Sequence, residues 1–159
     1  MEKIYGAAGR MDGIQQTGRK RWEIFYGYGE DDGVGYNYRL TLDHRPGVHE
    51  VRQIILDQIN ANTDAKILGG FVWNGINVWL SAENQTNFKA AYDLNAQSGG
   101  KMLPIKFKLG EDAEGNPVYH TFEDMEDFTN FYVSAVAYIN ECLNAGWSEK
   151  DGLDMSPYE

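Results

Sequence analysis

The chain has 159 residues, of which 42% are hydrophobic and 13% aromatic, so it can bury a core and is not intrinsically disordered. Its formal net charge of −10 disfavours general binding to the phosphate backbone of nucleic acids. We expect neither a membrane span nor secretion, because no run of about 18 apolar residues occurs and the opening segment has no apolar signal core.

Residues 1–21 differ in charge from the rest of the chain. They hold five basic and two acidic side chains, a net charge of +3, so the other 138 residues carry −13. Four glycines lie in the same segment, and such segments cost entropy to order. We therefore predict a basic, glycine-rich arm that docks on an acidic neighbouring subunit; the alternative is a frayed terminus. Its candidate contact residues are Tyr5, Arg10, Arg19, Lys20 and Arg21.

The next segment predicts a hairpin followed by a helix. Apolar and polar side chains alternate over 22–28 and 36–43, which is typical of half-buried antiparallel strands joined by a turn at 30–33. Pro46 then opens a helix, because its fixed φ suits the first turn. We expect this helix to end at 62–64. Its apolar residues recur at helical spacing: Val48, Val51, Ile55 and Ile59.

A second hairpin is predicted around Asn74-Gly75, a pair that tolerates the positive φ of a two-residue type I′ turn. This turn sets Trp73 opposite Ile76 and Phe71 opposite Val78 on one face, which Leu80 joins, with Ser81 as the N-cap of the following helix. The other face carries Val72, Asn77 and Trp79. Val72 and Trp79 are either covered by a helix or exposed as an apolar patch for a partner, so we count both as partner-contact candidates.

A third hairpin is predicted from strands at 103–109 and 118–122, because Ile105, Phe107 and Leu109 alternate with Lys106 and Lys108. A long helix over 122–145 follows, with Thr121 as its N-cap. Cys142 falls on the apolar stripe of that helix and is expected to be buried. As the only cysteine it can form no intrachain disulfide, which fits folding in a cytosol. Gly146 is expected to end the helix.

Together these elements predict an α+β fold of three hairpin-helix units in the order ββαββαββα, with an antiparallel sheet covered by helices on one side. The corresponding domain organisation is an arm over 1–21, a single α+β domain over 22–147 and a polar tail over 148–159.

No enzyme active site is predicted. His44, His49 and His120 are spread over two units and Cys142 has no cysteine partner, so we expect no metal and no cofactor. Acidic residues crowd 123–127, where the N-terminal end of the predicted helix favours anions without any catalytic role.

The strings FVWNG at 71–75 and VWLSAENQ at 78–85 resemble a domain of unknown function found in tail proteins of tailed phages and prophages, including those of gut Bacteroidetes. Residues 48–147 follow the same order: a helix, a strand pair ending in Trp-Leu-Ser, a helix, a Leu-Pro strand, a Tyr-His-Thr-Phe strand and an aromatic helix.

This resemblance implies a non-enzymatic structural protein, a small tail, tail-fibre or connector subunit that acts through protein–protein assembly. It would be made in the cytoplasm of the host bacterium and located in the tail of the virion. Its implied partners are other tail or virion proteins, in a homo-oligomer or a hetero-assembly, without nucleic acid or membrane. Two alternatives are a tail-fibre assembly chaperone absent from the virion and an uncharacterised carboxylate hydrolase.

Overall fold

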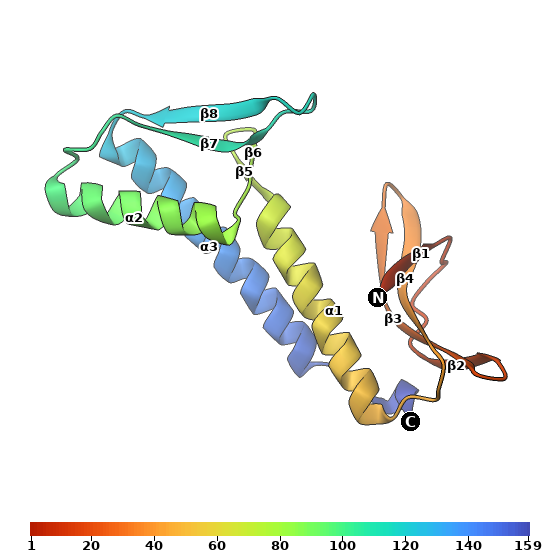
Figure 1. Cartoon of the computed structure of the whole chain (residues 1–159). Helices are drawn as coiled ribbons and strands as arrows, with labels where there is room; N and C mark the ends of the chain where they lie inside the picture. The colour runs from red at the N-terminus through yellow and green to blue at the C-terminus, as the bar shows by residue number, and fades with distance from the viewer. The chain divides into compact units, whose positions relative to one another are not determined.

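A computed structural model describes residues 1–159, which fall into two compact units. Unit 1 comprises residues 1–60 and 149–159, and unit 2 comprises residues 61–148, where the sequence led us to expect one domain over 22–147. Helices α1 (Val48–Gly69) and α3 (Met125–Asp151) supply residues to both units (Figure 1). Strand pairs followed by helices confirm the predicted α+β class. The strands are antiparallel and lie in three separate sheets.

Unit 1 contains a four-stranded sheet in the order β1-β4-β3-β2. Its strands are β1 (Glu2–Tyr5), β2 (Gly13–Gly18), β3 (Arg21–Asp31) and β4 (Val34–Leu42). The expected free arm over 1–21 is therefore corrected: β1 pairs with β4, and β2 pairs with β3.

Two contacts hold the connection between β1 and β2 against the sheet. The buried Asn37 side chain accepts a hydrogen bond from the Met11 amide at 3.0 Å and donates one to the Gly9 carbonyl at 2.9 Å. Gly35 lacks a side chain where one would meet the Ala7 carbonyl oxygen at 2.1 Å. Backbone pairing and this close approach compensate the entropy cost of ordering the glycine-rich segment. The charge pattern gave no sign of these contacts.

The C-terminal segment also packs into unit 1 rather than forming a polar tail. A 3₁₀ turn, η1 (Ser156–Tyr158), follows α3, and the Tyr158 side chain is only 1% exposed. The Tyr158 hydroxyl donates a hydrogen bond to the Phe25 carbonyl oxygen at 3.0 Å. This tyrosine completes a core shared with β3 and α1, whose other buried members are Ile24, Tyr26, Val51, Ile55 and Ile59.

Unit 2 begins with the residues of α1 from Ala61 onward, since α1 continues past the expected end at 62–64. The hairpin of β5 (Phe71–Trp73) and β6 (Ile76–Val78) follows, with the predicted pairing of Trp73 with Ile76 and of Phe71 with Val78. Asn74 and Gly75 have φ of 50° and 78°, which confirms positive φ at both turn positions.

Replacing Gly75 by valine is expected to destabilise unit 2 by about 1 kcal/mol or more, because a β-branched residue resists positive φ. A Cβ at Gly75 would meet no atom within 4 Å, so the cost comes from the backbone alone. Urea denaturation should show no comparable loss for Asn77→Val on the exposed face of β6, where valine suits a strand. Equal stability of both variants would contradict the type I′ turn.

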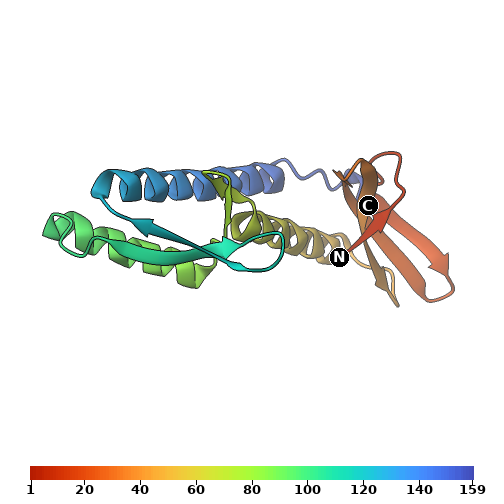
Figure 2. The same cartoon turned by 90° about the horizontal axis from the view of Figure 1, so that it is seen from above.

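Helix α2 (Ala82–Ser98) begins and ends as the sequence predicts. The Ser81 hydroxyl accepts a hydrogen bond from the Asn84 amide at 3.2 Å, and Gly99 closes the helix with a φ of 67°. The hairpin of β7 (Ile105–Glu111) and β8 (Pro117–Phe122) follows. In the two views of Figures 1 and 2, this hairpin lies over α2 and over the unit 2 part of α3.

The limits of α3 differ from the predicted helix over 122–145. The helix begins later because the Asp124 carboxylate, not Thr121, accepts a hydrogen bond from a first-turn amide, that of Asp127, at 2.9 Å. It also runs through Gly146, which does not end it. A Cβ at Gly146 would meet the Thr63 hydroxyl oxygen at 2.5 Å, so this glycine permits close packing of α3 on α1 within unit 2.

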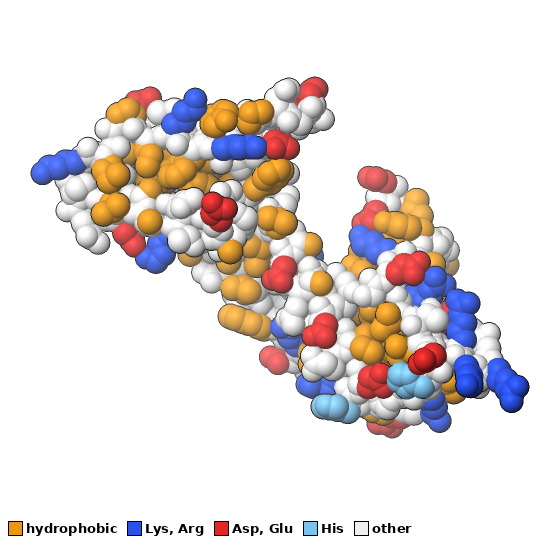
Figure 3. Space-filling model, in the orientation of Figure 1, with side chains coloured by type: hydrophobic (Ala, Val, Ile, Leu, Met, Phe, Trp, Pro, Cys, Tyr) orange, Lys and Arg blue, Asp and Glu red, His pale blue; other side chains and the backbone are white.

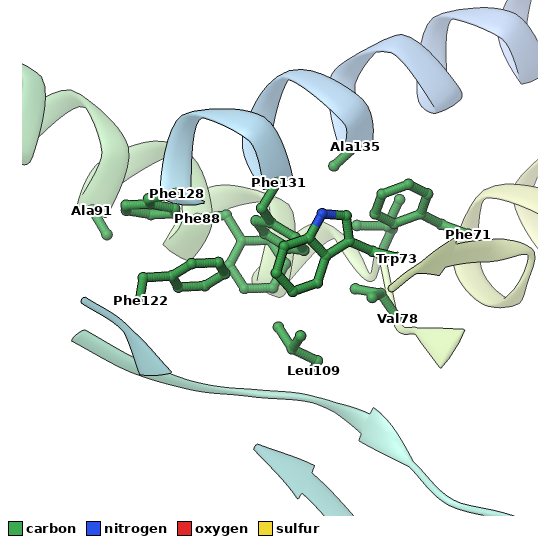
Figure 4. Close-up of a cluster of buried hydrophobic side chains, with 11 residues drawn as sticks. Phe71, Trp73, Val78, Phe88, Ala91, Leu109, Phe122, Phe128, Phe131 and Ala135 are labelled. Atoms are coloured by element: carbon green, nitrogen blue, oxygen red, sulfur yellow. The ribbon is translucent and has the colours of Figure 1, made fainter. Parts of the chain in front are cut away.

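The core of unit 2 is largely aromatic (Figure 4). The Phe131 ring contacts four others, with centroid distances of 5.0 Å to Phe122, 5.1 Å to Phe88, 5.2 Å to Trp73 and 6.3 Å to Phe71. These rings come from β8, α2 and β5, so one side chain of α3 ties the elements of unit 2 together. Cys142 is buried, as its place on the apolar stripe predicts.

Candidate partner-binding surfaces

The seven predicted contact residues divide between the two units. Val72 and Trp79 belong to unit 2. Unit 1 contains the other five, Tyr5, Arg10, Arg19, Lys20 and Arg21. Each group is described separately below.

Three of the unit 1 candidates are engaged within their own unit. The Tyr5 hydroxyl donates a hydrogen bond to Asp31 at 2.7 Å, which raises the pKa of Tyr5. Arg10 pairs with Asp12 at 2.6 Å, and Arg21 pairs with Glu23 at 2.8 Å. These contacts leave few of the predicted side chains free for a partner.

Arg19 and Lys20 form the exposed turn between β2 and β3, and neither makes an ion pair. They are the unit 1 candidates whose charges stay available to an acidic neighbour. Two solvated cations contribute more to the rate and salt dependence of association than to affinity.

The two unit 2 candidates lie on one exposed face of the β5–β6 hairpin. Val72 is 62% exposed and Trp79 is 40% exposed, so no helix covers them and both side chains are accessible from solvent. Val72 pairs with Asn77, and Trp79 follows two residues later on the same face.

This exposed face continues from the β5–β6 hairpin onto the β7–β8 hairpin. The ammonium group of Lys108 lies 5.3 Å from the centroid of the Trp79 ring, Lys108 pairs with Tyr119 across β7 and β8, and the Lys106 ammonium lies 4.5 Å from the Tyr119 ring. We call this set the hairpin-face row: Val72, Trp79, Lys106, Lys108 and Tyr119. Figure 3 shows hydrophobic side chains interleaved with lysines over these hairpins.

Gly110 allows the β5–β6 and β7–β8 hairpins to approach each other closely. The Trp79 amide donates a hydrogen bond to the Leu109 carbonyl at 2.8 Å. Gly110 makes this approach possible, because a Cβ there would meet the Asn77 carbonyl oxygen at 2.2 Å. The alternation of Lys106 and Lys108 with apolar residues placed both lysines outside the core in the sequence. No pattern in the sequence indicated that Tyr119 would share a surface with Trp79.

The hairpin-face row is cationic on an acidic unit. Unit 2 has eleven acidic and five basic side chains, a net charge of −6, and two of its five basic side chains lie in the row. Each lysine lies over an aromatic ring, a cation–π arrangement worth about 0.5–1 kcal/mol at an exposed site. Lys108 also pairs with Glu111 at 2.8 Å, so the free positive charge of the row is that of Lys106. The row offers this charge beside flat apolar surface, which suits an acidic protein partner.

Several titratable side chains of the chain form hydrogen-bonded pairs and small groups. The Asp127 carboxylate accepts a hydrogen bond from the His120 Nε2 at 2.9 Å. The His120 and Trp73 ring centroids are 4.9 Å apart, so His120 belongs to the edge of the core. His44 lies between Asp43 and Glu50, and its hydrogen bonds to them raise its pKa. No group of three or more His, Cys, Asp or Glu side chains is arranged to hold a metal ion.

The fold and surfaces define an α+β protein with two exposed sets of candidate contact residues: Arg19 and Lys20 in unit 1, and the hairpin-face row in unit 2. None of its helices combines the length and the apolar character needed to cross a bilayer. Residues 50–158 match the family described as domain of unknown function (DUF4376), and the chain belongs to that family. No curated protein and no solved structure matches it. Unit 2, with the whole hairpin-face row, lies inside the matched region.

Proposed function

We propose that the chain is a non-enzymatic assembly protein of a tailed phage, a small subunit of the tail, a tail fibre or a connector. The observation that carries the assembly role is the hairpin-face row. The phage and tail context rests on the resemblance of residues 48–147, centred on the strings around Trp73 and Trp79. The protein would be made in the host bacterium and incorporated into the virion.

The composition of the row supports partner binding over a purely structural role. Trp and Tyr are enriched among the residues that dominate binding energy, and they lose little conformational freedom when they are covered. Trp79 and Tyr119 are exposed, and the lysines beside them favour an acidic partner surface. The partner is another virion protein or another copy of the chain.

Replacing both Trp79 and Tyr119 by alanine in the encoding phage is expected to reduce the copies of this chain in purified particles at least tenfold. Central interface aromatics each contribute about 2 kcal/mol or more to binding. The loss of both therefore weakens binding by much more than tenfold. Quantitative mass spectrometry of particles measures the copy number. Leu94→Ala, an equally exposed apolar change on α2, should leave it unchanged.

The copy number in wild-type particles distinguishes a virion subunit from an assembly chaperone. A stoichiometric number of copies supports a virion subunit. Absence from particles, together with co-purification of the chain with an unassembled fibre protein, contradicts that role and indicates the assembly-chaperone alternative. Absence from both would contradict the assembly function altogether.

A further inference from the structure

Helix α3 carries a second apolar stripe that its own unit does not cover. Its buried residues are Phe128, Phe131, Ala135, Cys142 and Gly146, and Figure 4 shows the first three facing the core. A different set recurs at spacings of three and four residues on the solvent side, and we call it the outer stripe: Val133, Val136, Asn140, Leu143 and Trp147. Such spacing places side chains on one face of a helix that can pack lengthwise on another helix.

The outer stripe is open to solvent. Val133 is 56% exposed and Trp147 is 54% exposed, Asn140 is also exposed, and Leu143 is half-buried. A helix that packs on its unit from one side needs an apolar arc of about 100°. The arc of α3 is wider, because it continues from the core through Tyr132 and Ile139 to Val136, and these three also line a cavity of about 370 Å³ beside α2.

The outer stripe is almost free of charge. Between Phe128 and Ser148, Glu141 is the only charged residue, in a chain in which 24% of residues are charged and the net charge is −10. Copies with this net charge repel one another over most of their surfaces. A long neutral face removes that repulsion, so it favours a second copy of the same chain as the partner.

Asn140 lies at the centre of the outer stripe with two members on either side. An amide in an otherwise apolar contact must be hydrogen-bonded, because burying it without a partner leaves its desolvation uncompensated. A two-fold axis through Asn140 would bring the two amides of a pair of copies together, and an amide has both a donor and an acceptor group. The same axis brings Val133 opposite Trp147, and it brings Val136 within one residue of the position opposite Leu143, so that small side chains face large ones.

We propose that two copies pair through the outer stripes of their α3 helices, antiparallel, about an axis at Asn140. A parallel pair would set the acidic first turns, with Glu126 and Asp127, beside each other, whereas the antiparallel pair separates them. This inference deepens the proposed assembly function by naming its self-association surface. The helices are already formed within the fold, so pairing does not require helix nucleation.

Sedimentation equilibrium of the full chain tests the pairing, and the wild type should be a dimer. Replacing both Val133 and Trp147 by lysine should weaken the dimer at least about a hundredfold, because the two lysines face each other across the contact. Both positions are more than half exposed, so the monomer should keep its fold and its circular dichroism. The double change of Ser134 and Ala145 to lysine, exposed positions off the stripe, should leave the dimer intact.

Charge complementation tests the orientation. With Val133→Glu and Trp147→Lys in one chain, an antiparallel pair sets Glu opposite Lys twice and should restore the dimer. A parallel pair would set like charges together, so a monomer would overturn the antiparallel arrangement. A monomeric wild type, or a dimer that survives lysine at both positions, would overturn the pairing itself.

These outcomes are independent of the proposed function. A dimer that is absent from particles would overturn the virion role and leave the outer stripe standing. A monomeric chain that is present in particles would overturn the pairing through the outer stripe and leave the virion role standing.

Discussion

The variant Phe131→Ala is expected to lose about 3–5 kcal/mol of unfolding free energy, the usual cost of truncating a buried phenylalanine. Phe131 is 0% exposed, and its ring contacts Phe71, Trp73, Phe88 and Phe122. These four come from three elements, so the cavity left by the ring cannot close by the movement of one side chain. Packing density in such cores leaves little room for relaxation.

Urea denaturation followed by tryptophan fluorescence and by circular dichroism measures this loss. Leu68→Ala is the matched control, because Leu68 is a large apolar residue on α1 that is about half exposed. Its change should stay within about 0.5 kcal/mol, as for most surface substitutions. If both variants lose the same stability, Phe131 is not the centre of the unit 2 core.

The variant Gly110→Ala is expected to cost about 2–4 kcal/mol, the sum of a forced backbone shift and a lost backbone hydrogen bond. The added Cβ would lie 2.2 Å from the Asn77 carbonyl oxygen, and backbone cannot move aside as a flexible side chain can. The two hairpins must then separate, which breaks the bond from the Trp79 amide to the Leu109 carbonyl. Hydrogen exchange at the Trp79 amide should become much faster.

Gly69→Ala is the matched control for this variant. Its Cβ would meet nothing within 4 Å, and Gly69 does not have a positive φ, so the same substitution should be neutral or slightly stabilising. The Gly110 variant should also weaken partner binding, because separation of the hairpins divides the hairpin-face row between Trp79 and Lys108. Unchanged stability and exchange would show that the hairpins are not joined at Gly110.

The hairpin-face row could be predicted in part from local rules. A two-residue turn determines which side chains share a face, so Val72 and Trp79 were placed together correctly. Alternation likewise placed Lys106 and Lys108 outside the core. The link between the two hairpins could not be predicted, because it depends on Gly110, whose role appears only when a strand distant in sequence lies against it.

The N-terminal segment shows the opposite case. Its charge and glycines predicted a separate arm with Tyr5, Arg10 and Arg21 free for a partner. The structure instead pairs Tyr5 with Asp31, Arg10 with Asp12 and Arg21 with Glu23. Composition cannot distinguish a free arm from strands that find their partners elsewhere in the chain, because the compensating hydrogen bonds are not local.

The sequence by itself determined the features that depend on neighbouring residues. These are the α+β class, the Asn74-Gly75 turn and its register, the Ser81 cap of α2 and the buried face of α3 with Cys142. Each follows from backbone preferences or from side-chain periodicity within a few residues.

Only the tertiary structure decided which distant segments meet. It placed β1 and β2 in the unit 1 sheet, buried Tyr158, joined the hairpins at Gly110 and left the outer stripe of α3 uncovered. Contacts between residues far apart in the chain depend on the complementary shapes of the two segments and on backbone hydrogen bonds between them. The local pattern of either segment alone contains neither.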